Sequence, residues 1–178
     1  MIEPAPLPWP PAPIRTARLL LREPLAGDRA AIVELFTSPE VGTYIGGPRP
    51  REEFERTLPE VPQGRPGLLV VDLDGTMIGL VTLDPHGSGR LAHLHPEGGA
   101  RELGYLFLPH AWGRGYATEA CTAALDWLAG ALPDTPVALT TQTANTASRR
   151  VAERLGFTEL ERYEEYGAEQ WFGIRHPN

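Results

Sequence analysis

The chain has 178 residues, of which 42% are hydrophobic and 22% are charged, proportions typical of a single globular domain with a proper core. Sixteen Lys and Arg against 23 Asp and Glu give a formal net charge of -7, which argues against nonspecific nucleic-acid binding and mildly favours cationic substrates. A lone cysteine, Cys121, excludes an internal disulfide, and the absence of a transmembrane run or signal segment predicts a cytoplasmic protein.

The N-terminal half is predicted to begin with an arm and to continue as mixed helix and strand. Six prolines within residues 1–13 force extended backbone and remove hydrogen-bond donors, so an arm is expected ahead of a single domain at residues 14–178. Asp74-Gly75 is a preferred hairpin turn between two apolar runs. The elements expected in this half are a strand at 16–22, a helix N-capped by Asp28 and ending near residue 36, a short helix at 51–58, and strands at 68–72 and 77–83.

The C-terminal half is predicted to alternate strands and helices. Apolar side chains recur with a period of about 3.6 between Ala117 and Leu128, which indicates an amphipathic helix. After a loop at 85–99, the expected elements are a strand at 102–108, this helix, a strand at 137–141, a helix N-capped by Asn145 and closed by Gly156, and strands at 157–163 and 170–174. A strand–helix–strand crossover after antiparallel hairpins requires a parallel neighbour or a sheet that splays apart, so a mixed α/β fold of the α+β class is predicted.

A glycine turn lies between the strand at 102–108 and the helix that follows it. Gly113 and Gly115 permit backbone angles that other residues resist, so consecutive N–H groups can converge on an anion at the positive end of the helix dipole. The pattern GxxxxGK[ST] is absent from the chain, and Thr118 stands where a dinucleotide fingerprint has its third glycine or alanine. The turn is therefore predicted to bind the phosphates of a different ligand.

A third phosphate-binding pattern overlaps this turn. Trp112, Gly115 and Ala117 occupy the defined positions of (Q/R)-x-x-G-x-(G/A), with Trp in place of Gln or Arg. This is the acyl-CoA-binding motif of the GNAT N-acetyltransferase superfamily, and the run at 112–120 resembles the branch of the RimJ and RimL ribosomal-protein acetyltransferases. Residues 145–157 are similar to the second cofactor motif of that branch, and residues 16–22 resemble its opening strand.

This resemblance implies a fold, a cosubstrate and a set of binding residues. The implied GNAT fold has a central, mostly antiparallel sheet that splays between its two central strands and is flanked by helices. The implied cosubstrate is acetyl-CoA, whose pantetheine arm pairs with strand backbone in the slot as an added strand; no metal is expected. The residues expected to bind it are Leu106, Phe107, Leu108, Gly113, Arg114, Gly115, Tyr116, Ala117, Thr118, Asn145 and Ser148.

Acetyl transfer to an amine requires a base, a donor to the developing oxyanion and a proton for the departing thiolate. The resemblance implies Glu102 as the base, acting through a water, Ser148 as the acid, and a backbone N–H near Leu108 as the oxyanion donor. Simpler interpretations stay open, because a glutamate at a strand start is often only solvated and Ser148 can satisfy donors of the first helical turn. Tyr105 and His110 are reserve candidates for acid or base.

The remaining reactive side chains carry weaker signals. His93 and His95 could project on one face of a strand, but a third ligand is not evident, so no metal site is predicted. Cys121 lies in the apolar helix stripe and is expected to be buried, which favours direct attack over an acetyl-cysteine intermediate.

The predicted function is that of an N-acetyltransferase acting in a ternary complex on a primary amine. Neutralising an α-amine at pH 7 costs about 1 kcal/mol and neutralising a lysine about 4–5 kcal/mol, so a protein N-terminus, such as that of a ribosomal protein, is favoured over lysine. Aminoglycoside or polyamine acceptors, a noncatalytic acyl-CoA-binding module and a nucleotide-binding regulatory domain are the alternatives. A homodimer through the late strands is compatible with the pattern; no direct nucleic-acid or membrane partner is expected.

Overall fold

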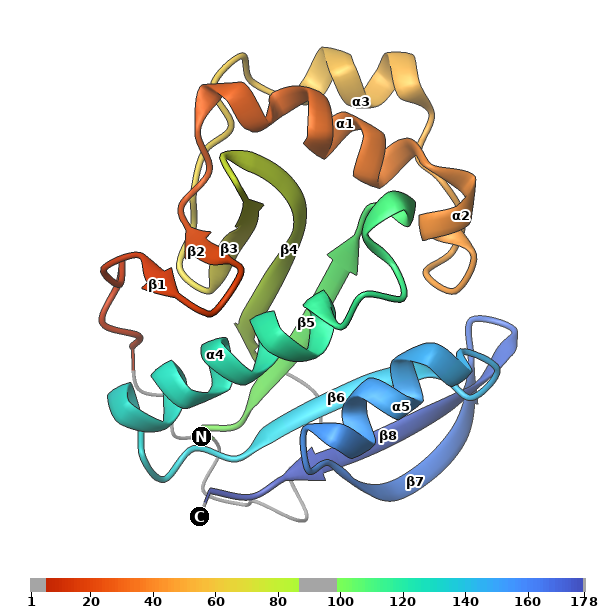
Figure 1. Ribbon diagram of the computed structural model, residues 1–178. Helices are drawn as coiled ribbons and strands as arrows, with labels where there is room; N and C mark the ends of the chain where they lie inside the picture. The colour runs from red at the N-terminus through yellow and green to blue at the C-terminus, as the bar shows by residue number, and fades with distance from the viewer. Residues whose placement is uncertain (1–5, 87–98, 178) are drawn as a thin grey trace.

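The computed structural model describes residues 6–86 and 99–177. Within them, an eight-stranded sheet combines with five α-helices and two short 3₁₀ helices (Figure 1). The strands are β1 (Ile14–Arg15), β2 (Leu20–Arg22), β3 (Leu68–Leu73), β4 (Thr76–Pro85), β5 (Arg101–Phe107), β6 (Val137–Gln142), β7 (Thr158–Glu165) and β8 (Ala168–Arg175). The helices are η1 (Ala26–Asp28), α1 (Arg29–Thr37), α2 (Pro39–Gly42), α3 (Arg51–Thr57), η2 (Pro109–Ala111), α4 (Tyr116–Ala131) and α5 (Thr146–Arg154).

The sheet is antiparallel except at its centre. Its strand order is β1-β2-β3-β4-β5-β6-β8-β7, and β5 and β6 form the parallel pair. These two strands pair at Arg101↔Val137 and Glu102↔Ala138 and then diverge, as Figure 1 shows. The predicted α+β fold, with a mostly antiparallel sheet that splays between two central strands, is confirmed.

Two local predictions in the N-terminal half have different outcomes. The hairpin between β3 and β4 forms as predicted, with Asp74 and Gly75 both at positive φ, 52° and 88°. The strand expected at 16–22 is wrong in its first half, because Thr16 and Leu19 close a turn. The Thr16 N–H donates to the Leu19 carbonyl, and the Leu19 N–H donates to Thr16 Oγ1, each at 2.9 Å.

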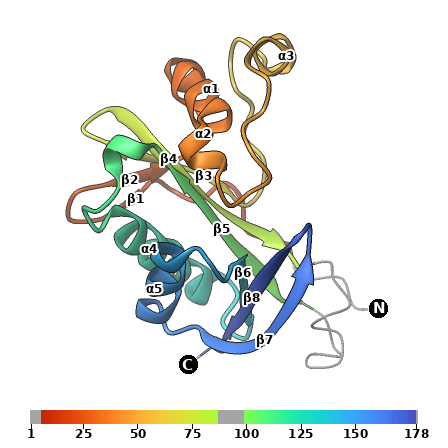
Figure 2. The same cartoon turned by 90° about the vertical axis from the view of Figure 1, so that its right-hand side faces the viewer.

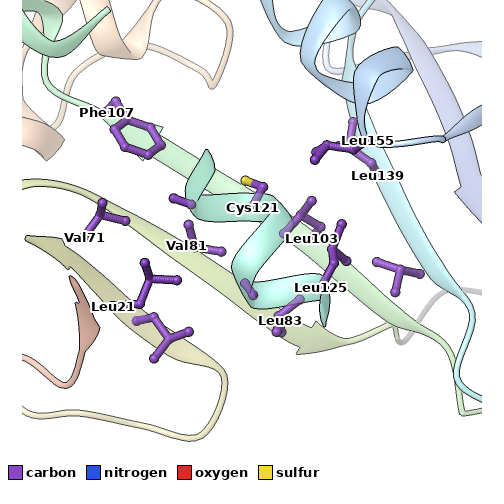
Figure 3. Packing of buried hydrophobic residues seen from close by; sticks show 14 of the residues in the cluster. Leu21, Val71, Val81, Leu83, Leu103, Phe107, Cys121, Leu125, Leu139 and Leu155 are labelled. Carbon is purple, nitrogen blue, oxygen red and sulfur yellow. The ribbon is translucent and has the colours of Figure 1, made fainter. Parts of the chain in front are cut away.

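Helices cover both faces of the sheet (Figure 2). Helices α4 and α5 bury their apolar stripes against one face, and α1 and α3 pack on the other face over β3 and β4. The larger core lies between the sheet and α4–α5 (Figure 3), and its members include Leu21, Val71, Val81, Leu83, Leu103, Phe107, Cys121, Leu125, Leu139 and Leu155. The gap between β5 and β6 is therefore bordered by these two strands and by the helices that follow them.

The described part of the proline-rich segment lies against this larger core. Leu7 and Trp9 pack on it, and the Trp9 ring meets Trp127 of α4 edge-on with centroids 5.9 Å apart. Of the described helices, none is both long and apolar enough to cross a membrane.

Asp28 has a different role from the predicted one. Its side chain does not cap α1; it accepts hydrogen bonds from Arg22 Nη1 and Nη2 at 2.8 and 3.0 Å and from the Leu25 N–H at 2.7 Å. Arg22 also donates from Nε to Asp72 at 2.8 Å. Asp28 occupies the N-cap position of α1 as predicted, but Arg22 on β2 holds its carboxylate, so the side chain does not cap the helix. The two acidic side chains are less than 10% exposed.

The stability of the fold is expected to depend on Asp28 in a pH-dependent way. Burial alone raises the pKa of the Asp28 carboxyl, but the hydrogen bonds from Arg22 and Leu25 outweigh burial and lower that pKa below its usual value. Its contribution is therefore present above the unfolded-state pKa of about 3.9 and is lost as the pH falls below it. Asp28→Asn should lower the free energy of unfolding at pH 7 by about 3 kcal/mol, because it leaves a buried guanidinium with fewer charged partners.

Urea denaturation of wild type and Asp28→Asn at pH 7 and near pH 3 measures this effect. The stability deficit of Asp28→Asn should be smaller at the lower pH, because the contribution of the wild-type carboxylate is lost progressively as the pH falls from its unfolded-state pKa towards its lowered native pKa. Asp126→Asn, the same change on the exposed face of α4, is the control and should match wild type. An Asp28→Asn deficit of equal size at both pH values would contradict the assignment.

Candidate active site

The glycine turn after β5 leaves a row of backbone donors free. Gly113 and Gly115 have φ of 71° and 79°, in the left-handed region that favours glycine, and Gly115 is the residue before α4. Within the described part of the chain, none of the N–H groups from Gly113 to Thr118 donates a hydrogen bond. These groups lie at the positive end of the α4 dipole, so the predicted anion cradle has the donors that it requires.

Trp112 stands where the usual motif has Gln or Arg, and its contacts show how it can replace them. Its indole Nε1–H donates to the Phe107 carbonyl at 2.8 Å, while the residue as a whole is 49% exposed. The first motif position therefore ties the glycine turn back to the end of β5. A tryptophan can do this through its ring N–H, so the loop is anchored without the Gln or Arg of the usual pattern.

Arg18 braces the turn from the β1–β2 connection, a role that the sequence did not reveal. Its Nε donates to Glu119 at 2.9 Å, its Nη1 donates to the Arg114 carbonyl at 2.9 Å, and its guanidinium lies 4.4 Å from the centroid of the Tyr116 ring. A Cβ added to Gly115 would come within 3.4 Å of Arg18 Nη2. The partners are 101 residues apart in the chain, so local spacing carries no signal for this contact.

Every second residue of β5 directs its backbone toward the gap. The Leu108 N–H donates to the Ile78 carbonyl of β4 at 2.9 Å, whereas the Arg101 N–H donates to the Pro136 carbonyl on the β6 side at 3.0 Å. Because bonding direction alternates along a strand, the odd-numbered residues point their N–H groups toward β6. The oxyanion donor expected near Leu108 is therefore not the Leu108 N–H, which is already used, and the adjacent group that faces the gap is the Phe107 N–H.

Ser148 and Tyr105 meet on the face of the sheet that α4 and α5 cover. Asn145 Oδ1 accepts the Ser148 N–H at 3.2 Å, so Asn145 is the N-cap of α5 as predicted. Ser148 Oγ lies 2.6 Å from the Tyr105 hydroxyl oxygen, so its hydroxyl contacts another side chain. Burial raises the pKa of the Tyr105 phenol more than its hydrogen bond with Ser148 lowers it. The Tyr105 phenol is thus protonated at physiological pH, and either hydroxyl can be the donor in this contact.

Glu102 lies on the opposite face of the same strand. Leu103 and Phe107 pack in the core under α4, so alternation places Glu102, Gly104 and Leu106 on the other side. The Glu102 side chain is 41% exposed, and its Oε2 lies 3.1 Å from Nδ1 of a histidine at position 86. Leu106 is an even-numbered residue of β5, as Leu108 would be in the same alternation. Its N–H therefore points to β4 and not into the gap.

The other reactive side chains are exposed, buried in the core or outside the described residues. His110 is exposed on η2. Cys121 is completely buried, and burial raises the pKa of its thiol. His93 and His95 lie outside the described residues, and among those that are described no group of His, Cys, Asp and Glu could hold a metal ion.

The geometry of a glycine cradle beside a splayed parallel pair matches a known domain. The sequence profile of the acetyltransferase (GNAT) domain matches residues 18–158. The chain belongs to the GNAT acetyltransferase family. No curated protein sequence matches it significantly.

Solved structures support this family assignment. A GNAT-family acetyltransferase from Bacillus anthracis is 22% identical with a TM-score of 0.73, and the match covers 93% of this chain and 98% of the other. An acetyltransferase from Agrobacterium tumefaciens strain C58 is 28% identical with a TM-score of 0.69, covering 97% and 98%. RimL, a ribosomal L7/L12 α-N-protein acetyltransferase in complex with coenzyme A, has the same fold at 15% identity and a TM-score of 0.68, covering 93% and 98%.

The residues of this GNAT acetyltransferase suit acetyl-CoA, the acetyl donor of the family. The free N–H groups from Gly113 to Thr118 match a diphosphate. The odd-numbered N–H groups of β5 face a gap that no strand of the described residues fills beyond Glu102, so an amide-containing arm can add there as a strand would. Both features are formed by backbone groups. This explains why the motif specifies glycine in the turn more strictly than it specifies particular side chains.

Proposed function

We propose that this acetyltransferase moves the acetyl group directly from acetyl-CoA to a primary amine, with the α-amine of a protein N-terminus as the favoured acceptor. The observation that carries the proposal is the placement of Glu102 and of the Ser148–Tyr105 pair on opposite faces of β5, the strand that leads into the free cradle. A base and an acid so separated can serve an incoming amine and a departing thiolate at the same time.

In the proposed reaction each group has one task. Glu102 accepts a proton from the amine through a water as the new C–N bond forms. The Phe107 N–H donates to the carbonyl oxygen as it becomes an oxyanion. Ser148, hydrogen-bonded to Tyr105, gives a proton to the sulfur as the C–S bond breaks. One proton leaves the neutral amine and one reaches the thiolate, and exchange with solvent then removes the proton from Glu102 and restores that of Ser148, so the cycle is balanced.

Direct transfer is favoured over a covalent intermediate by the position of the lone cysteine. Cys121 has no exposed surface, and burial keeps its thiol protonated by raising its pKa. A thioester would have to reach it through the packed core between the sheet and α4 (Figure 3). The acetyl group is therefore transferred directly, without a covalent acetyl-enzyme intermediate.

The choice of acceptor rests on the strength of the base. Glu102 is a partly exposed carboxylate, which suits an amine whose deprotonation at pH 7 costs about 1 kcal/mol better than a lysine at about 4–5 kcal/mol. A protein of the same fold, RimL, is named as an α-N-protein acetyltransferase. Another is named as an aminoglycoside acetyltransferase, at 17% identity, so a small-molecule amine is the second candidate acceptor.

A panel of acceptors tests both parts of the proposal. Acetyl-CoA is mixed with a lysine-free peptide that has a free N-terminus, with an N-terminally blocked peptide that contains one lysine, with an aminoglycoside and with a polyamine. Thiol release and mass spectrometry should show acetylation of the first peptide in preference to the second. Preferential acetylation of the aminoglycoside or polyamine would overturn the N-terminal assignment, and failure with every amine would overturn the proposed reaction.

The Ser148–Tyr105 contact gives a further prediction. Ser148→Ala and Tyr105→Phe should each lower kcat by about 10-fold, and the double variant should be little worse than either single one, because the two hydroxyls act as a unit. The affinity for acetyl-CoA, measured by calorimetry, should fall much less than kcat, because the cradle consists of backbone N–H groups that neither substitution changes. Thr122→Ala removes an exposed hydroxyl of α4 that bonds only to its own helix and is the control. Multiplicative effects of the two changes would show that the hydroxyls act independently.

A further inference from the structure

His86 follows β4 and holds its imidazole in a fixed position beside Glu102. Its backbone N–H donates to the Ala100 carbonyl at 2.9 Å, which extends the β4–β5 ladder past Pro85↔Arg101. Its side chain is only 6% exposed, and its ring lies on Phe172 of β8 with centroids 5.9 Å apart and planes 33° apart. The ring is therefore anchored by β5 through the backbone and by β8 through packing.

The direction of the hydrogen bond follows from the chemistry of the partner. Nδ1 of His86 lies 3.1 Å from Glu102 Oε2. An ionised carboxylate can only accept, so Nδ1 must carry the proton. The imidazole is thus a rigid donor that faces one oxygen of a carboxylate whose side chain is 41% exposed.

We propose that His86 is a positioning residue for Glu102: it holds Oε2 through Nδ1–H so that Oε1 is presented to the acceptor amine or its water. This proposal rests on the proposed role of Glu102 as base. A glutamate has several rotatable bonds, and an exposed one loses that freedom when it is ordered. The buried ring restricts it before the acceptor arrives, which is how a base is kept within reach of the proton that it must take.

The surroundings of the pair agree with this role. Gly104, two residues after Glu102 on the same face of β5, has no side chain, and Ala138 opposite Glu102 on β6 has a small one. Neither can hold the carboxylate. Asp84, which pairs with Glu102 from β4, is an acidic side chain held by Arg65. Among the described residues, the side chain that holds the Glu102 carboxylate is thus His86, which lies 16 residues earlier in the chain.

Two substitutions separate the hydrogen bond from the bulk of the ring. His86→Asn places an amide N–H near the position of Nδ1, whereas His86→Leu keeps the size and removes the donor. We expect His86→Leu to lower kcat by about 10-fold and His86→Asn to restore it to within about threefold of wild type, both with unchanged affinity for acetyl-CoA. In a Glu102→Gln background, His86→Leu should cause little further loss. His176→Leu, an exposed histidine at the end of the chain, is the control.

A second measurement does not depend on activity. Nitrogen NMR of the histidine rings should show His86 with its proton on Nδ1 in the wild type and a changed tautomer ratio in Glu102→Ala, where the acceptor is gone. An Nε2–H tautomer in the wild type would overturn the proposal even if no acceptor amine were found. Equal loss of kcat in His86→Leu and His86→Asn, or full additivity with Glu102→Gln, would also overturn it and leave the proposed acetyl transfer standing.

Discussion

Glu102→Gln is expected to lower kcat for amine acetylation by about 10²–10⁴-fold, the usual loss when a general base is removed. Glutamine has the size of glutamate and can still accept the hydrogen bond from His86 Nδ1, but it cannot take a proton. Because Glu102 lies on the face of β5 away from α4, the affinity for acetyl-CoA should be unchanged. The effect therefore belongs to the chemical step.

Steady-state kinetics with the preferred peptide and calorimetry with acetyl-CoA measure the two quantities separately. Glu53→Gln, on the exposed side of α3, makes the same chemical change far from the gap and should behave as wild type. A Glu102→Gln enzyme with near wild-type kcat would remove the base from the proposed reaction, and a loss of acetyl-CoA affinity would show a role in binding.

Gly115→Glu should weaken acetyl-CoA binding by about 100-fold or more, because it brings a negative charge to a cradle for a diphosphate. A side chain at φ of 79° is also strained by about 1–2 kcal/mol, and its Cβ would lie 3.4 Å from Arg18 Nη2. Both effects disturb the turn that presents the free N–H groups. Calorimetric titration with acetyl-CoA measures the affinity, and thermal denaturation reports the fold.

Two glycine variants distinguish charge from strain. Gly115→Asn accepts the left-handed conformation more readily and adds no charge, so it should lose far less affinity. Gly130→Glu adds the same charge near the other end of α4, where a Cβ meets no atom within 4 Å, and should bind as wild type. Equal losses in Gly115→Asn and Gly115→Glu would mean that strain, rather than charge at the cradle, governs binding.

The structure places the proposed catalytic groups on different faces of the sheet, an arrangement that is not evident from the sequence. The cradle and the Ser148–Tyr105 pair lie with α4 and α5, while Glu102 and His86 lie on the other face. Donor and acceptor can therefore approach the gap from different sides. That arrangement is consistent with a ternary complex and with direct transfer.

Several features of the structure are determined by residues that are close together in the sequence. Glycines at 113 and 115 encode the left-handed turn, Asn145 encodes the start of α5, and Asp74-Gly75 encodes the hairpin. In each case a residue's own backbone preference or a side chain three positions away decides the conformation. The order of strands and helices also led to a parallel neighbour or a splayed sheet as the alternatives, because a crossover must end on a parallel neighbour unless the sheet opens, and the resemblance to the family implied the splay.

The other contacts depend on how different helices, strands and connections pair in the folded structure. The partner of Asp28 is Arg22 on another element, the brace of the glycine turn comes from Arg18, and Glu102 meets His86. Likewise, which β5 amide faces the gap depends on the register with β4, and that register directs the Leu108 N–H to β4 and leaves the Phe107 N–H facing the gap. The sequence by itself determined the turn, the cap and the order of the elements, since these depend on short-range backbone preferences. Hydrogen-bond direction and charge pairing depend on which strands lie side by side, so only the folded structure decided them.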